Sequence, residues 1–132
     1  SQARARAIYH SLIEAELTAY LRASAPAALD VITCADTLCY FGTLDEVFAA
    51  AAPALRPGGW WIFTTEHAGV GSTAGGFELQ AHGRYRHERT YVDRALESAG
   101  FAEVRIAEAA LRLNHGEPVP GLIVAARVRE AA

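Results

Sequence analysis

The chain has 132 residues, of which 52% are hydrophobic and 20% charged, so it is long enough for one domain with a core and too apolar for wholesale disorder. A net charge of −3 argues against a nucleic acid partner held through its phosphates. No apolar run is long enough to cross a bilayer and no secretory leader is recognisable, which predicts a cytoplasmic protein. The spacings of Cys34, Cys39 and the five histidines predict free thiols and no metal site.

The first 23 residues allow two interpretations. No Gly or Pro interrupts them before Pro26, and a helical face is formed by Ile8, Leu12, Ile13, Leu17, Tyr20 and Leu21. The first interpretation is therefore one helix over residues 1–24. The second places a short strand at residues 11–16 (SLIEAE) between two helices. Because the chain begins within this helical pattern and contains no methionine, we expect it to be a piece of a longer protein.

Two buried strands are predicted between residues 28 and 66. Residues 28–35 (ALDVITCA) are apolar and rich in β-branched side chains, as in strands that are covered on both faces of a parallel sheet. Residues 60–65 (WWIFTT) have the same character. A helix between them would make a strand-helix-strand unit, in which the two strands are parallel.

The helix of this unit has its own start and stop signals. Thr43 and Glu46 have the spacing of a capping box, which predicts a helix beginning there. Pro53 should kink the helix or end it early, because it lacks a backbone N–H. The Pro-Gly-Gly sequence at residues 57–59 predicts a turn before the second strand.

The segment from residue 67 to 88 is rich in glycine and shows no periodicity, which predicts a long loop. Thr90 and Asp93 form a second capping box, and Gly100 ends the helix that follows.

The C-terminal third reads as a hairpin. Residues 101–107 and 122–128 are the predicted strands, with a turn across residues 111–121 that holds Asn, Gly and two prolines. Taken together, the element order predicts an α/β fold with a mostly parallel sheet, helices on both faces and a C-terminal antiparallel β-hairpin.

Three segments carry a family resemblance: DVITCADTLCYF at residues 30–41, LRPGG at 55–59 and SAGF at 98–101. In this order and spacing they resemble the C-terminal portion of a class I S-adenosylmethionine-dependent methyltransferase, most of all bacterial predicted methyltransferases. The resemblance implies a single domain that is part of a Rossmann-like sheet, with a helical segment over residues 1–27 and the methyltransferase half over 28–132. The glycine-rich loop that opens this fold is absent from the sequence.

The resemblance also implies where S-adenosylmethionine would lie. In open α/β sheets the ligand lies outside the carboxyl ends of the strands. Cofactor contacts are therefore implied for Ala35, Asp36 and Thr37 after the first strand, and for Glu16 and Leu17 near the adenine. Without the glycine-rich loop this cofactor site is incomplete.

Residues implied in the reaction follow the same strand ends. The catalytic candidates are Asp36, Tyr40, Glu66 and His67. Glu66 and His67 follow the second strand, where a general base would lie. An anionic acceptor could be bound by Arg84, Tyr85 and His87, which precede the last helix.

Two functions remain open from the sequence. The first is a methyltransferase fragment, inactive alone, whose parent enzyme methylates a small molecule or a protein. The second is a non-catalytic interaction module with a methyltransferase-like fold; a nicotinamide-dependent oxidoreductase fits the terminal hairpin less well. Because strands of the family sheet are missing, we expect the bare edge of strand 28–35 to be covered by the N-terminal helix or by a second copy of the chain.

Overall fold

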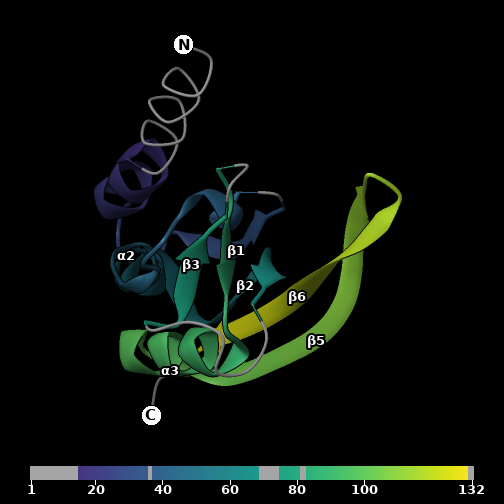
Figure 1. The fold of residues 1–132 in the computed structure, drawn as a ribbon. Coiled ribbons are helices and arrows are strands. Elements are labelled where there is room, and N and C mark those ends of the chain that lie inside the picture. Colours follow the sequence, from purple (N-terminus) through teal and green to yellow (C-terminus); the bar gives the residue numbers. More distant parts are fainter. Residues whose placement is uncertain (1–14, 36, 69–74, 81–82, 131–132) are drawn as a thin grey trace.

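The computed structural model describes residues 15–35, 37–68, 75–80 and 83–130, and their strands form one mixed sheet (Figure 1). The strands of this sheet are β1 (Leu29–Cys34), β2 (Leu55–His67), β3 (Phe77–Leu79), β4 (Tyr85–His87), β5 (Phe101–Asn114) and β6 (Glu117–Val128). The helices are α2 (Asp45–Ala54) and α3 (Arg89–Ala99), with a 3-10 turn, η1, at Leu38–Tyr40. The mixed α/β class predicted from the sequence is confirmed.

The sheet order is β3-β4-β2-β6-β5, and β1 also pairs with β2. β1 and β2 are parallel, whereas β6 is antiparallel to both β2 and β5. β4 pairs in parallel with Glu66 and His67 of β2. The pairing of β1 with β2 ends earlier, at Phe63. The expected parallel pair and C-terminal antiparallel hairpin are therefore both present, and the carboxyl ends of β1 and β2 lie at one edge.

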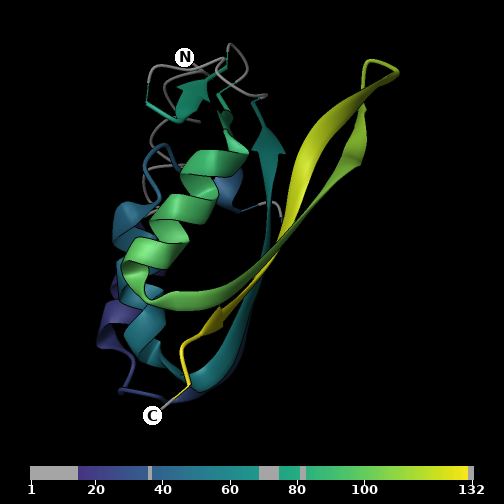
Figure 2. The same cartoon turned by 90° about the horizontal axis from the view of Figure 1, so that it is seen from below.

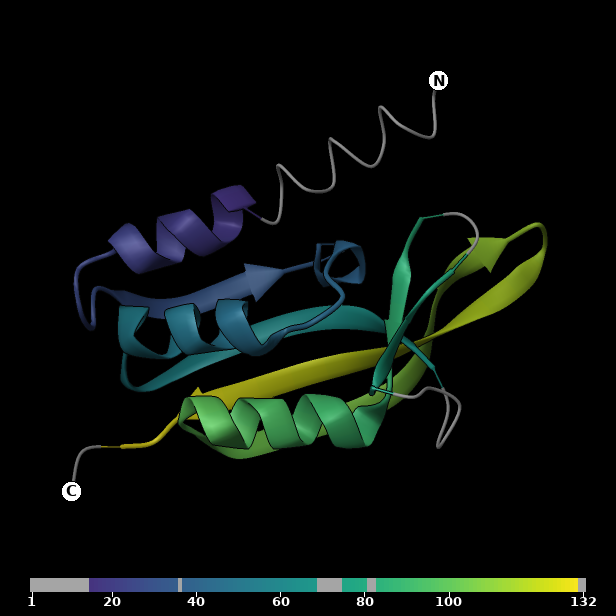
Figure 3. The same cartoon turned by 60° about the vertical axis from the view of Figure 1, so that its left-hand side comes forward.

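Helices α2 and α3 lie on the same face of the sheet (Figures 2 and 3). Under them Phe48 of α2 packs on Trp61 and Phe63 of β2, with ring centroids 5.2 and 5.5 Å apart. The sequence predicts helices on both faces, but in the described part of the chain the opposite face carries no helix. Val31 and Ile62 are exposed there, because alternate residues of a strand point to opposite faces.

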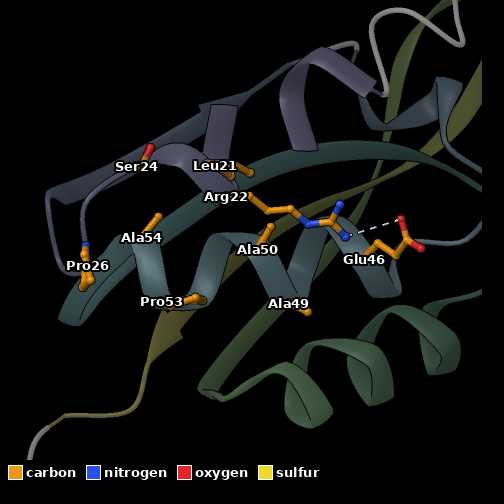
Figure 4. Close-up of a pocket in the computed structure, with 9 residues that line it drawn as sticks. All are labelled: Leu21, Arg22, Ser24, Pro26, Glu46, Ala49, Ala50, Pro53 and Ala54. Carbon is orange, nitrogen blue, oxygen red and sulfur yellow. Dashed lines mark ion pairs between the residues drawn. The ribbon is translucent and has the colours of Figure 1, made fainter. Parts of the chain in front are cut away.

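Residues 15–23 form a helix that packs beside α2 through the buried Leu21 (Figure 4). Arg22 of this helix lies 3.7 Å from Glu46 of α2. A shallow pocket of about 300 Å³ lies between the two helices. Ala15 and Glu16 are helical, which disagrees with a strand at that point; residues 1–14 lie outside the described residues.

The predicted Pro-Gly-Gly turn is part of a strand. β2 begins at Leu55 and includes residues 57–59, and the register with β1 shifts between Leu29 and Val31. Residues 57–59 form an irregularity at the start of the β1–β2 pair. A Pro-Gly-Gly sequence is compatible both with such an irregularity and with a loop, so the sequence alone does not separate the two.

The two predicted capping boxes do not form. Leu44 precedes α2 without a side-chain cap, although the Thr43 hydroxyl accepts a 3.4 Å hydrogen bond from the Asp45 N–H. α3 begins at Arg89, so Thr90 lies inside it. The predicted helix end at Gly100 is confirmed, with a left-handed φ of 109°.

The C-terminal hairpin is longer than predicted. β5 and β6 continue to Asn114 and from Glu117, so the turn contains only residues 115 and 116. The two strands curve and project beyond the rest of the sheet as an arm (Figures 1 and 2). The loop predicted over residues 67–88 holds the short strands β3 and β4. Among the described residues no helix is long and apolar enough to span a membrane.

Candidate functional site

The residues predicted to contact the cofactor lie in different surroundings. Ala35 is exposed after β1, and its carbonyl accepts a 3.1 Å hydrogen bond from the Thr37 hydroxyl. Asp36 lies outside the described residues. Glu16 is exposed on the helix of residues 15–23, and Leu17 packs partly against the core. Glu16 and Leu17 are helical, whereas the resemblance places them at the end of a strand.

Glu66 is the centre of a buried polar cluster at the carboxyl end of β2. Its side chain is 4% exposed and lies 2.9 Å from Arg112 Nη2 and 3.5 Å from Arg84 Nη1. Gln80 Nε2 donates a further hydrogen bond of 3.1 Å. Arg112 comes from the β5–β6 arm, while Gln80 and Arg84 come from the segment around β3 and β4. One carboxylate therefore fastens the arm and this segment to the central strand.

The surroundings of Glu66 keep it ionised. Burial alone would raise the pKa of Glu66, but hydrogen bonds from Arg112 and Gln80 and the charges of Arg112 and Arg84 lower the pKa below its usual value. A carboxylate held in this way is a weak proton acceptor. The geometry therefore suits an anchor better than the general base predicted for this position.

Tyr40, another predicted residue, contacts the cluster of Glu66 through Arg84. The guanidinium of Arg84 lies 5.5 Å from the centre of the Tyr40 ring, a cation–π contact. Arg84 is already engaged by Glu66 and Tyr40, so binding of an acceptor anion by Arg84 stays a prediction. Tyr85 packs by its ring on Phe77, with centroids 6.1 Å apart.

His87 is fully buried, and both of its ring nitrogens are paired. Nδ1 contacts the Thr65 hydroxyl, and Nε2 lies 2.9 Å from the Phe41 carbonyl and 3.0 Å from that of Gly42. Burial lowers the pKa of His87 to about 4. A neutral, enclosed imidazole joins β4 to β2 and to the loop after η1, which leaves it no free nitrogen for the predicted acceptor contact.

His67 differs from His87 in its pairing. Its Nδ1 lies 3.3 Å from Glu108 Oε1 on β5, while its buried Nε2 has no hydrogen-bond partner among the described residues. Sequence reasoning missed Glu108, Arg112 and Gln80. No local pattern marks them, because they reach the site only through the register of the β5–β6 arm and the β3–β4 pair.

No protein-family model matches the chain, and no curated protein matches its sequence. Its fold is similar to that of an S-adenosylmethionine-dependent methyltransferase from Methanosarcina mazei, with a TM-score of 0.60 and 11% identity over 83% of this chain and 63% of that one. A second such enzyme, from Mesorhizobium loti, gives a TM-score of 0.58 and 20% identity over 81% of this chain and 66% of that one.

A third similar structure is the Burkholderia thailandensis 1,6-didemethyltoxoflavin-N1-methyltransferase, which contains S-adenosylhomocysteine. Its TM-score is 0.59 and its identity 16%, over 83% of this chain and 48% of that one. The chain thus spans from 48% to 66% of the lengths of these three proteins. At these identities the comparison concerns the fold alone, and it shows that the chain has the Rossmann-like fold of S-adenosylmethionine-dependent methyltransferases.

Proposed function

We propose that the chain is the C-terminal part of an S-adenosylmethionine-dependent methyltransferase, whose parent enzyme methylates a small-molecule or protein acceptor. The supporting observation is the strand order β1-β2-β6-β5, with antiparallel β6 inside the sheet, in a fold shared with enzymes of that activity. This order brings the polar side chains around Glu66 and His67 to the carboxyl end of β2. Ligands of open α/β sheets lie at that edge.

The chemistry of methyl transfer fits a site of this kind. A methyl group on a sulfonium needs a nucleophile held in line with it, and orientation alone can account for most of the rate. Such a site needs rigid walls and placed polar groups more than a covalent nucleophile. The partly buried cluster of Glu66, Arg84 and Arg112 would supply a rigid wall.

The described residues fit only one side of a site for S-adenosylmethionine. The turn at Ala35 and Thr37 and the ring of Tyr40 follow β1, at the end of the sheet where we propose that the cofactor is held, but the sequence contains no Gly-x-Gly-x-Gly loop. Glu16 is on a helix. We expect residues outside this chain to complete the site, and we assign no methyl-transfer step to this chain alone.

The alternative is a non-catalytic interaction module. The observation that favours it is the apolar surface on the face opposite α2 and α3, where Val31 is 52%, Ile62 41% and Ile123 42% exposed. Solvated faces of sheets usually carry polar residues. A second copy of the chain, pairing at the outer edge of β1, is one partner that this reading allows.

Titration with S-adenosylhomocysteine, followed by calorimetry and thermal unfolding, tests the proposal. A ligand at 100 times its Kd stabilises a protein by about 2.7 kcal/mol, which shifts the Tm by several degrees. Tyr40→Leu should weaken binding, whereas Tyr20→Leu, at an exposed position on the helix of residues 15–23, should not.

The outcomes separate the two functions. Binding by this chain supports a cofactor site that it contributes to directly. Binding only by a chain extended at its N-terminus supports an acceptor-side half that is inactive alone. If neither binds, the interaction module becomes the better explanation.

A further inference from the structure

His67 and Glu108 form a close imidazole–carboxylate contact at the carboxyl end of β2. The distance from His67 Nδ1 to Glu108 Oε1 is 3.3 Å. The other carboxylate oxygen of Glu108 accepts a 3.2 Å hydrogen bond from Nη1 of Arg89, the first residue of α3. Arg89 is itself held by a 3.1 Å hydrogen bond from Nη2 to the Ile106 carbonyl. Glu108 is therefore oriented from the side opposite the imidazole.

This pairing determines which nitrogen of a neutral His67 carries the proton. An ionised carboxylate only accepts hydrogen bonds, so a carboxylate oxygen 3.3 Å from Nδ1 favours the tautomer in which Nδ1 is the N–H and Nε2 keeps its lone pair. Glu108 thus selects the tautomer that leaves Nε2 able to accept a proton. The same division of roles operates wherever a carboxylate orients a catalytic imidazole.

The second nitrogen of His67 is the unusual feature. Nε2 is buried and has no hydrogen-bond partner in the described part of the chain. Buried polar atoms are nearly always paired, and each exception calls for an explanation. The contact of Nδ1 with Glu108 does not explain why Nε2 is left unpaired. As an ion pair this contact would also stabilise the fold only a little, because Glu108 is 53% exposed. A hydrogen-bond donor from a bound ligand would explain it.

We propose that Nε2 of His67 takes the proton from the group that is methylated, and that this group is a hydroxyl or an amine. Glu108 is the positioning residue of His67. This inference rests on the function proposed above and specifies its acceptor. The O–H or N–H bond breaks, its electron pair stays on the oxygen or nitrogen, and the proton forms a new bond to the Nε2 lone pair. The imidazolium that results is balanced by the Glu108 carboxylate.

The other two candidates at this edge cannot take the proton as readily. Glu66 is engaged by Arg112, Arg84 and Gln80, and both nitrogens of His87 are paired. An acceptor that is already ionised, such as a carboxylate, would need no base. The presence of an unpaired imidazole nitrogen therefore favours acceptors that must lose a proton.

The tautomer of His67 can be read from imidazole ¹⁵N chemical shifts at a pH where the ring is neutral. In the unaltered chain we expect a protonated Nδ1 and a bare Nε2. Glu108→Ala should shift His67 toward the Nε2–H form that free histidine favours in water. Glu108→Gln should preserve part of the original tautomer through its amide oxygen, and Glu117→Ala, at an exposed site of the same arm, should change nothing. A protonated Nε2 in the unaltered chain would overturn the proposal.

Diethylpyrocarbonate, which acylates imidazole nitrogens that carry a lone pair, tests whether a ligand can reach Nε2. We expect acylation of His67, detected by mass spectrometry of peptides, and slower acylation in Glu108→Ala. No acylation of His67 under conditions that fully modify the exposed His115 would mean that Nε2 is sealed, and would refute the proposal. Both measurements are made without cofactor, so a failure to bind S-adenosylhomocysteine would count against the proposed function and not against the role of Glu108.

Discussion

His87 is expected to make the chain less stable as the pH falls from 7 to 5. In the folded protein burial lowers its pKa from 6.5 to about 4. As the pH falls, His87 therefore becomes protonated near pH 6.5 in the unfolded chain but only near pH 4 in the folded chain. Because the unfolded state binds more protons in this window, the free energy of unfolding decreases as the pH falls.

The size of the effect follows from the two pKa values. Each unit is worth about 1.4 kcal/mol, so the full displacement amounts to about 3 kcal/mol, of which about 2 kcal/mol is lost between pH 7 and pH 5. Glu66 contributes little in this range. Its pKa is lowered on folding, so the stability it adds is lost only at more acidic pH, around and below its usual value of 4.5.

Urea unfolding followed by circular dichroism at pH 7, 6 and 5 measures this loss. His87→Leu removes the titrating group, so its free energy of unfolding, although lower at pH 7, should change far less with pH. His115→Asn alters an exposed histidine at the turn of the β5–β6 arm and should retain the full dependence. An equal fall in His87→Leu and in the unaltered chain would refute the assignment to His87.

Three further changes test the packing, each by urea unfolding at pH 7. Phe48→Ala removes a fully buried ring that contacts two aromatic rings of β2 and should cost about 3–5 kcal/mol, against a small change for the exposed Val31→Ala. Gly100→Ala places a side chain at a φ of 109° and should cost about 1 kcal/mol. Gly121→Ala would place a Cβ in collision with the Leu111 side chain and should cost about 1–3 kcal/mol, most of which Leu111→Ala should restore in the double variant.

Each of these has an outcome that would contradict it. A loss below about 1 kcal/mol for Phe48→Ala would mean that α2 is not packed on β2 as described. A neutral Gly100→Ala would mean that α3 does not end in a left-handed residue. Failure of the double variant to recover stability would show that the cost at Gly121 arises elsewhere than at Leu111.

Much of the fold could be predicted because its signals are local. The strands β1 and β2, the helix between them, the left-handed end of α3 at Gly100 and the antiparallel β5–β6 pair all follow from runs of neighbouring residues. The predicted burial of both faces of β1 is wrong, because Val31 is 52% exposed on the face that carries no helix in the described part of the chain. Predictions that relied on a single short motif were less successful. The Thr90 capping box was wrong because α3 begins at Arg89, so that Thr90 lies inside the helix. The Pro-Gly-Gly segment lies within β2 because pairing with β1 outweighs its turn preference.

The sequence by itself also determined that polar residues lie at the carboxyl ends of the strands, including Glu66 and His67 at the end of β2. Only the tertiary structure decided what each of them can do. Glu66 became an anchor and His87 a buried neutral ring, while His67 was paired with Glu108. The physical reason is that charge and protonation depend on neighbours in space. Those neighbours come from segments 14 to 46 positions away, whose places are set by the register and packing of the whole sheet.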